Sequence, residues 1–317
     1  MVGNEQSEWE NVRSGIPQGS VLGPLLFVIF INDLPDVVHS TVKIFADDTK
    51  IYSKINSYED SELLQRDLDK LYEWAELWQL RFNANKCKVM HQGNANHQFQ
   101  YKMDNQTLER VTDEKDLGVT IDNELKFHKH VSLAVSKANQ MLGIAKRTFS
   151  ELDKETLTTV YKTLVRPHLE YGNVIWHPKY VADIQKVESV QRRATKLINN
   201  DLKDKPYQDR LKKLNLFSME YRRQRGDMIQ VYKILKGMDR LDAESLFQPN
   251  TGYCRGHSLK LFKQRCNKEI RKLAFSQRVV DSWNSLTEEI VSAESLNTFK
   301  SRLDKYWKSK WYQISTE

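Results

Sequence analysis

Two adjacent carboxylates, Asp47 and Asp48, are the side chains of this 317-residue chain best suited to chemistry. They lie between two β-rich runs, residues 41–46 and 49–52, so we expect a tight strand turn that carries both. A hard divalent cation such as Mg²⁺ would satisfy two neighbouring carboxylates, and such cations support nucleotidyl transfer. The alternative is a solvated Asp-Asp turn without a ligand, which is the usual state of this dipeptide.

The surrounding sequence predicts the elements that position this pair. Up to about residue 121 it indicates an α+β arrangement, and after residue 126 apolar residues recur at helical spacing. The predicted elements are a Gly/Pro-rich loop (14–24), a buried apolar helix (25–32), the two strands, an amphipathic helix (59–78), a strand (86–91), an antiparallel β unit (99–121), helices at 127–149, 156–176, 181–199 and 207–236, a linker (248–254), a short strand (258–262), and helices at 275–286 and 295–307.

Net charge divides the chain in the same place. Residues 1–125 carry 12 Lys and Arg against 21 Asp and Glu, a net charge of −9. Residues 126–317 carry 37 against 21, a net charge of +16. A basic helical surface suits a polyanion, and a solvated lysine-rich surface is the alternative. The basic helix faces predict nucleic-acid binding by Arg192, Arg193, Lys196, Arg222, Arg223 and Arg225.

Several other classes of protein are disfavoured. The polar, acidic N-terminal residues do not resemble a signal or transit peptide. The longest apolar run, residues 21–31, is too short to span a bilayer, so we expect no membrane partner. The cysteines, Cys87, Cys254 and Cys266, form no CxxC pair and indicate free thiols of an intracellular protein, in the nucleus or the cytoplasm.

The order of several segments resembles one enzyme family. SGIPQGSVLGPLLFVIFINDLP, which starts at Ser14, resembles motif B of the reverse transcriptases of jockey-type and related non-LTR (LINE-type) retrotransposons. KIFADDTKIY resembles their motif C, the metal-binding hairpin. WQLRFNANKCKVMHQG resembles motif D, KDLGVTIDNELKFHKHV the motif E region, and LVRPHLEYGNVIWHP the thumb. RGHSLKLFKQRC, FSQRVVDSWNSL and SLNTFKSRLDKYW resemble the tail beyond the thumb, so the likeness runs from about Trp9 to Trp307.

This resemblance implies a function and a role for particular residues. The chain is similar to the C-terminal portion of an RNA-directed DNA polymerase, which binds an RNA template, a DNA primer, their RNA–DNA hybrid and a dNTP. Lys86 is either the group that neutralises or protonates pyrophosphate or a plain surface lysine. The implied site has Asp47 and Asp48 as ligands of Mg²⁺ or Mn²⁺, with Phe45 beside the primer and Lys86 near the pyrophosphate. Pro17, Gln18 and Gly19 would lie beneath the template and the nucleotide. Leu117 and Gly118 would support the primer, and the alternative for these two residues is a strand with a bulge glycine.

The resemblance also implies domains and a departure from the family pattern. We expect a partial palm with motifs B, C and D (1–95), a motif E-like β unit (96–125), a helical thumb and connection (126–247) and a tail (248–317). The family's motif A aspartate has no counterpart upstream of Gly15, so we expect weak metal binding, an inactive fragment, an unpaired sheet edge and exposed apolar surface. The alternatives are a non-catalytic nucleic-acid-binding remnant and an open reading frame without a selected role.

Overall fold

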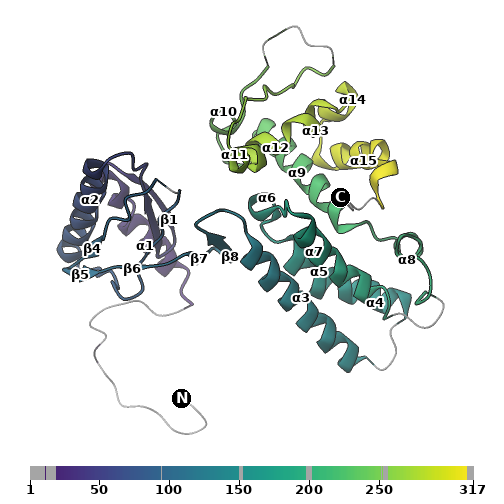
Figure 1. The fold of residues 1–317 in the computed structure, drawn as a ribbon, viewed down its shortest axis with the longest axis horizontal. Helices are drawn as coiled ribbons and strands as arrows, with labels where there is room; N and C mark the ends of the chain where they lie inside the picture. Colours follow the sequence, from purple (N-terminus) through teal and green to yellow (C-terminus); the bar gives the residue numbers. More distant parts are fainter. Residues whose placement is uncertain are drawn as a thin grey trace. The chain divides into compact units, whose positions relative to one another are not determined.

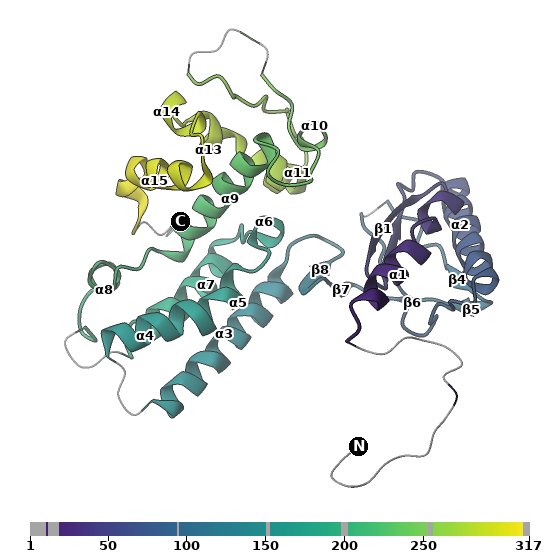
Figure 2. The ribbon, with the colours of Figure 1, turned by 180° about the vertical axis from the view of Figure 1, so that it is seen from behind.

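The computed structural model describes residues 11, 19–93, 95–149, 153–197, 202–250, 252 and 256–312 (Figures 1 and 2). The chain forms two compact units, Met1–Glu114 and Lys115–Glu317, and each is described by itself. Within the described residues, helices predominate and each sheet has two strands. The predicted α+β class is therefore confirmed.

Short strand pairs and two α-helices make up the first unit. Strand β1 pairs antiparallel with β2, and β4 with β5, whereas β3 pairs parallel with β6. Asp104 and Asn105 turn the chain between β4 and β5 with φ values of 49° and 58°, as a two-residue hairpin requires. The strand predicted at 86–91 is only two residues long. The elements are α1 (Leu22–Phe30), a 3₁₀ turn η1 (Leu34–Val37), β1 (Thr41–Phe45), β2 (Asp48–Tyr52), α2 (Tyr58–Leu77), β3 (Lys88–Val89), β4 (Lys102–Met103), β5 (Gln106–Thr107) and β6 (Glu109–Arg110).

Helix α2 supplies much of the core of this unit. Ser57 and Asp60 form a capping box at its start, in which each side chain accepts a hydrogen bond from the other residue's N–H. The helix is amphipathic, and its apolar face packs against residues from η1 and the β4–β5 hairpin. The buried cluster consists of Ile31, Leu34, Leu68, Leu71, Trp74, Ala75, Tyr101, Met103 and Leu108.

Asp67 lies on the buried face of α2 and fixes the start of β1. The residue is 2 % exposed, and its carboxylate accepts hydrogen bonds from the N–H groups of Ser40 at 2.8 Å and His39 at 3.2 Å. Burial alone raises the pKa of Asp67, but the hydrogen bonds from Ser40 and His39 and the charge of Lys70 outweigh it, so the pKa lies below its ordinary value. Because the carboxylate stays ionised, it is a strong acceptor for two partly buried backbone donors at the start of β1.

Helix α1 departs from the sequence prediction. The prediction of a buried helix is wrong for its outward face, where Leu22, Leu26 and Ile29 are exposed. Only Gly23 of the helix is buried, and Phe27 packs against the α2 core. The outward face is apolar because this helix is hydrophobic around most of its circumference. The exposed apolar surface expected from the sequence is therefore present here.

Helices dominate the second unit, and the unit boundary falls inside β7. Two buried clusters organise it: one joins α3, α4, α5 and α7, and the other joins α9 to the helices after residue 268. The elements are β7 (Asp113–Asp116), β8 (Val119–Asp122), α3 (His128–Thr148), α4 (Lys154–Val160), a π turn η2 (Tyr161–Val165), α5 (Arg166–Glu170), α6 (Asn173–Trp176), α7 (Val181–Ala194), α8 (Tyr207–Leu214), α9 (Met219–Leu235), α10 (Ala243–Leu246), α11 (Glu269–Leu273), α12 (Phe275–Arg278), α13 (Val280–Asn284), α14 (Glu288–Val291), α15 (Leu296–Tyr306) and a 3₁₀ turn η3 (Lys308–Lys310).

Several helices predicted as continuous are interrupted. The predicted 156–176 helix contains the π turn η2, because Pro167 cannot donate a hydrogen bond to the preceding turn and its ring crowds that turn. The predicted 207–236 helix breaks at Asn215, whose φ of 51° is left-handed. In place of a strand at 258–262, a single bridge joins Pro249 to Leu261.

Polar side chains inside the second unit tie its helices together. Glu188 of α7 has no exposed surface, and its carboxylate accepts hydrogen bonds from the Met219 N–H at 3.0 Å and the Tyr207 hydroxyl at 2.6 Å. Gln191, one turn later, accepts a hydrogen bond from the Tyr161 hydroxyl at 2.7 Å. Helix α7 therefore holds the starts of α8 and α9 as well as the π turn.

A second polar contact joins the two clusters. Arg278 of α12 donates to Asp227 of α9 at 2.8 Å and to the carbonyl of Val174 in α6 at 2.9 Å. Because Asp227 is almost fully buried, this ion pair fixes the position of α12 on α9. Among the described residues, no helix is long and apolar enough to cross a membrane.

We expect Asp67→Asn to destabilise the first unit by about 2 kcal/mol, because two partly buried hydrogen bonds lose their ionised, buried acceptor. The measurement is urea unfolding followed by hydrogen exchange of peptides from residues 58–77, so that the first unit is observed alone. Asp69→Asn is the control, since Asp69 is exposed and accepts a hydrogen bond only from Gln65 among the described residues.

The same loss depends on pH. The folded pKa of Asp67 is depressed, so its stabilisation is complete above the unfolded value of about 3.9 and is lost as pH falls through the folded pKa. The difference between wild type and Asp67→Asn should therefore shrink below about pH 4. A difference that stays constant from neutral pH down to this range would contradict the assignment.

Candidate functional site

The β1–β2 hairpin carries the predicted carboxylates. Phe45 pairs with Asp48 across the hairpin, so Ala46 and Asp47 form the two-residue turn and Asp48 is the first residue of β2. Ala46 has a φ of 52°, a left-handed conformation that costs an alanine about 1–2 kcal/mol. The predicted strand–turn–strand is confirmed, with its tip at Ala46-Asp47.

The two faces of this hairpin differ. Val42, Ile44 and Ile51 are partly buried toward the α2 core, whereas the opposite face is exposed. Phe45 is 63 % exposed, and because cross-strand partners project to the same side, its ring and the Asp48 carboxylate share the exposed face. An aromatic ring therefore lies next to a carboxylate on an accessible surface.

The carboxylates are only part of a metal site. Oxygen donors of this kind suit Mg²⁺ or Mn²⁺, and both carboxylates are exposed. Across the described ranges, no third Asp, Glu, His or Cys joins them in a group that could hold a metal ion. The nearby η1 acids, Asp33 and Asp36, are thus not part of such a group. Two carboxylates fit a cation whose other positions are filled by water or by groups from elsewhere.

The other residues predicted around the hairpin are placed only in part. Pro17 and Gln18 lie outside the described residues. Gly19 has a φ of 85°, a conformation that favours glycine, and a Cβ added to it would meet nothing within 4 Å. Lys86 is exposed at the end of a turn, where its N–H donates to the carbonyl of Asn83 at 2.9 Å. Lys86 makes no ion pair with any residue that the structure describes, so its assignment to pyrophosphate stays a prediction.

Leu117 and Gly118 form the turn between β7 and β8. Both have left-handed φ values, 44° and 88°, and the Tyr171 hydroxyl donates to the Leu117 carbonyl at 2.8 Å. A Cβ on Gly118 would lie 3.0 Å from Cε1 of Tyr171. The glycine is therefore required by the turn and by the tyrosine packed on it, and its role in primer support stays a prediction.

The arginines predicted on α9 are either buried or paired with a carboxylate in the structure. Arg223 is 1 % exposed, Arg222 donates to both carboxylate oxygens of Glu170, and Arg225 donates to Asp304 at 2.6 and 2.9 Å. Arg223 is thus buried, whereas Arg222 and Arg225 each pair with a carboxylate and keep 24 % and 20 % of their side-chain surface exposed. Their role in nucleic-acid binding stays a prediction.

The structure also places the basic residues that were predicted on α7 and just after it. Arg193 and Lys196 are exposed, as a phosphate-binding side chain must be. Arg192 is partly buried, and its guanidinium lies 5.2 Å from the centre of the Tyr207 ring, within cation–π range. Arg193 and Lys196 therefore stay available, and Arg192 contributes to packing.

Comparison with known proteins places the hairpin in context. Residues 1–144 match the family model described as "Reverse transcriptase (RNA-dependent DNA polymerase)", and the match includes Asp47, Asp48, Lys86 and Gly118. This part of the chain is similar to the reverse transcriptase family. The predicted resemblance is therefore confirmed on the residues that carry the candidate site.

The relatives are polymerases of mobile elements. The "RNA-directed DNA polymerase from mobile element jockey" of Drosophila melanogaster is 27 % identical over 209 residues, which are 61 % of this chain and 23 % of the relative. The probable polymerase from transposon X-element of the same species is 29 % identical, and the jockey polymerase of Drosophila funebris is 30 % identical, each over 59 % of this chain and 22 % of the relative. The chain thus spans about a fifth of the length of these relatives. No solved structure matches it significantly.

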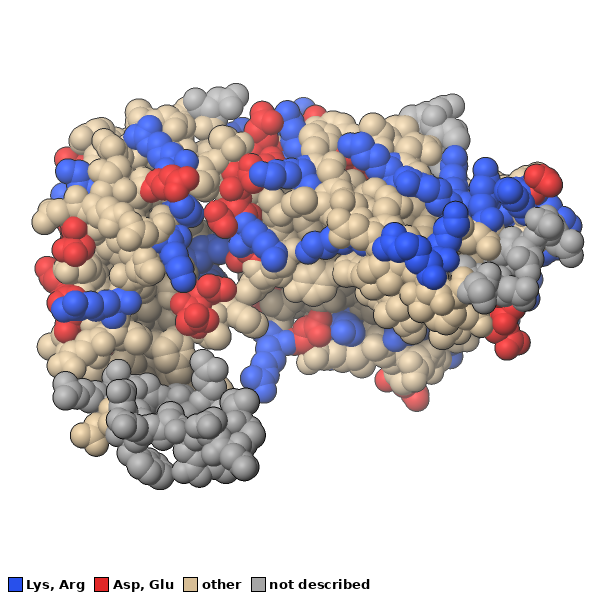
Figure 3. All heavy atoms as spheres, turned by 90° about the horizontal axis from the view of Figure 1, so that it is seen from below, with Lys and Arg blue, Asp and Glu red and all other residues tan. Residues whose placement is uncertain are grey.

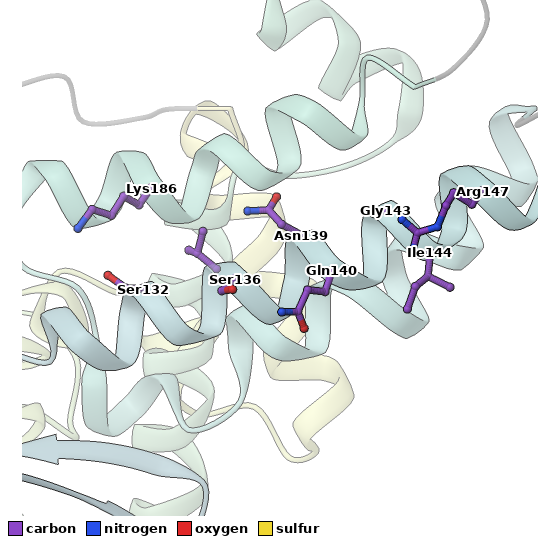
Figure 4. Close-up of a pocket in the computed structure, with 9 residues that line it drawn as sticks. Ser132, Ser136, Asn139, Gln140, Gly143, Ile144, Arg147 and Lys186 are labelled. Carbon is purple, nitrogen blue, oxygen red and sulfur yellow. The ribbon is translucent and has the colours of Figure 1, made fainter.

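A polar groove that the sequence did not reveal follows α3, which begins within the reverse transcriptase match. It has a volume of about 790 Å³, and Figure 4 shows its lining side chains along α3, with Lys186 toward one end and Arg147 at the other. Asp183, 1 % exposed, accepts from Lys186 at 3.0 Å and orients it. The sequence signal was a row of small polar residues at three- and four-residue steps. The lining residues are Ser132, Val135, Ser136, Asn139, Gln140, Gly143, Ile144, Arg147 and Lys186.

We expect Gly118→Ala to destabilise the second unit by about 2–3 kcal/mol, because the new Cβ meets Tyr171 in a left-handed turn. Gly237→Ala is the matched control: its φ is also positive, at 64°, but nothing lies within 4 Å of its Cβ position. This control should lose only about 1 kcal/mol of conformational preference. Chemical denaturation of both variants measures the difference, and equal losses would rule out the Tyr171 contact as the cause.

Proposed function

We propose that the chain is part of an RNA-directed DNA polymerase of a non-LTR retrotransposon. The observation that carries this proposal is the exposed Asp47-Asp48 hairpin within the residues that match the reverse transcriptase family. In this proposal residues 1–95 are part of the palm, 96–125 the motif E-like unit, 126–247 the thumb and connection, and 248–317 a C-terminal tail.

The proposed chemistry joins a nucleotide to a primer. The primer 3′-hydroxyl gives its proton to solvent water and its oxygen bonds to the α-phosphorus of the dNTP, while the bond from that phosphorus to the bridging oxygen breaks and pyrophosphate leaves. Mg²⁺ or Mn²⁺, when bound, lowers the pKa of that hydroxyl and offsets charge on the pyrophosphate. Asp47 and Asp48 hold the cation, Phe45 packs beside the primer end, and Lys86 neutralises or protonates the departing pyrophosphate. Pro17, Gln18 and Gly19 shape the floor beneath the template and the incoming nucleotide.

We further propose that a third carboxylate, from the motif A region of the complete polymerase, finishes this site. Two observations support an incomplete palm. The described sheet at Asp47 has two strands, so β1 and β2 each have an edge without a strand partner. The outward face of α1 is apolar and exposed, with Leu22 at 66 % and Ile29 at 63 %. Further polymerase sequence packed on α1 and on a strand edge would bury this surface.

A second candidate function is non-catalytic binding of nucleic acid. The net charge of +16 from residue 126 onward supports it, as does the α3 groove with a cationic residue at each end. Figure 3 shows Lys and Arg side chains running across one face of the second unit. From Ser132 to Arg147 the helix rises about 22 Å, which corresponds to about six phosphates of one strand at 3.4 Å each. Such binding needs no metal, whereas polymerase activity does.

We expect the 317 residues alone to bind Mn²⁺ weakly, with a Kd of about 1 mM, because only two carboxylates come together at this site among the described residues. Calorimetric titration of wild type, Asp47→Asn and Asp48→Asn measures this, and each substitution should abolish the heat of binding. Asp69→Asn is the control and should leave it unchanged.

Micromolar affinity of the wild type would contradict an incomplete site. So would template-dependent primer extension by the 317 residues that Asp47→Ala abolishes. Asp33 and Asp36 would then be the first carboxylates to test as the missing ligand.

We expect the full chain to bind an RNA–DNA duplex with little sequence preference and a steep salt dependence. For about six neutralised phosphates the slope of log K against log salt is about −5. Fluorescence anisotropy over a salt series measures it. The double variant Arg147→Gln, Lys186→Gln should reduce the slope by about 2, whereas Lys102→Gln in the first unit should not change it. A flat salt response would leave the solvated-surface alternative standing.

A further inference from the structure

Two arginines of the second unit lie at one carboxylate, and a lysine precedes them along the chain. Glu170, at the end of α5, accepts a bidentate pair of hydrogen bonds from Arg222 of α9 and lies 3.6 Å from Nε of Arg166. Lys162 lies in the π turn η2, four residues and about one turn before Arg166. The group carries three positive charges and one negative charge, so it is net cationic by two.

Some hydrogen-bond donors of this group have no acceptor among the described residues. Arg222 is fully engaged with Glu170, but the distance from Arg166 to Glu170 is too long for a hydrogen bond. The terminal nitrogens of Arg166 donate to none of the described residues, and within the same ranges Lys162 has no carboxylate partner. The Arg166 side chain keeps 18 % of its surface exposed and Lys162 is partly exposed, so the donors of these two side chains that reach solvent can meet an anion.

The backbone under this group is held firmly. Lys162 lies in the π turn η2, which Pro167 imposes, and π turns recur at functional sites. Tyr161 and Leu169, on the opposite face, are almost fully buried, and the Tyr161 hydroxyl donates to Gln191. The position of Arg222 is set by the start of α9, which Glu188 holds. Lys162 and Arg166 therefore project from a fixed surface.

Repulsion between these cations affects the lysine. Burial, followed by the positive charges of Arg166 and Arg222, lowers the pKa of Lys162. An anion placed between Lys162 and Arg166 would relieve this repulsion. A purely structural ion-pair network would instead balance its charges, as Arg225 and Asp304 do.

We propose that Lys162 and Arg166 bind a phosphate group of a nucleic-acid strand, with Glu170 and Arg222 holding Arg166 in place. This inference rests on the proposed nucleic-acid function and adds a contact outside the α3 groove and outside the hairpin. A guanidinium and an ammonium within one helical turn match the oxygens of a single phosphate. Glu170 does not repel that phosphate strongly, because Arg222 neutralises it.

The test is binding of an RNA–DNA duplex to the full chain across a salt series. Lys162→Gln should raise Kd by roughly threefold to tenfold at moderate salt and reduce the salt slope by about 1, as expected for one lost phosphate contact. Lys154→Gln is the matched control, since Lys154 is an exposed lysine on the helix that leads into η2. The control should change neither Kd nor slope. Both variants should keep the wild-type Tm, because neither lysine has a described ion pair.

Each outcome separates the inference from the proposed function. A wild-type chain that binds the duplex while Lys162→Gln keeps the wild-type Kd and slope would overturn the phosphate contact alone. A wild-type chain that does not bind the duplex would overturn both proposals. Binding of inorganic phosphate is measured as well. If phosphate binds the wild type but not Lys162→Gln, while Lys162→Gln keeps the wild-type salt slope for the duplex, the site binds free phosphate and its assignment to a nucleic-acid strand is wrong.

Discussion

A carboxylate without access to water joins three helices of the second unit. Glu188 of α7 accepts the first N–H of α9 and the hydroxyl of Tyr207 in α8. Burial raises the pKa of Glu188, and the hydrogen bond from Tyr207 and the charge of Arg223 oppose that rise. The N-terminal end of α9 adds a partial positive charge at the same point. Because breaking a buried charged contact typically costs about 3–5 kcal/mol, the direction in which α9 leaves this junction is strongly constrained.

The direction of α9 decides what its arginines contact. Successive residues of this helix turn Arg222 toward Glu170, Arg223 into the interior and Arg225 toward Asp304. The sequence shows a run of positive charge, and a run of charge is normally solvated. Its partners are 52 and 79 residues away along the chain, and no local pattern indicates them. Because Arg222 and Glu170 are 52 residues apart, no local sequence pattern indicates the cationic group that they form with Lys162 and Arg166.

Elements stabilised by neighbours in sequence were the predictable ones. The β1–β2 hairpin follows from alternating residues around a short turn, and α2 follows from its apolar periodicity and its Ser57–Asp60 cap. Breaks in helices were missed where one residue overrides a long periodic pattern, as Pro167 and Asn215 do. Burial of α1 was wrongly inferred, because composition says that a helix is apolar and not what packs on it. The candidate metal-binding carboxylates were located by type and spacing, whereas the α3 groove needs the packing of α3 against α7.

Ala46 has a consequence for how this hairpin tolerates mutation. Its left-handed backbone, with a φ of 52°, would be relieved by glycine, which adopts that conformation without a steric cost. Glycine would also widen the range of backbone angles open to the turn, and the carboxylate of Asp47 would sample more directions. Alanine at position 46 therefore lowers the stability of the fold, but it narrows the range of orientations of the Asp47 carboxylate. Selection for greater thermostability would therefore favour Ala46→Gly, and this substitution would leave the orientation of the Asp47 carboxylate less well defined.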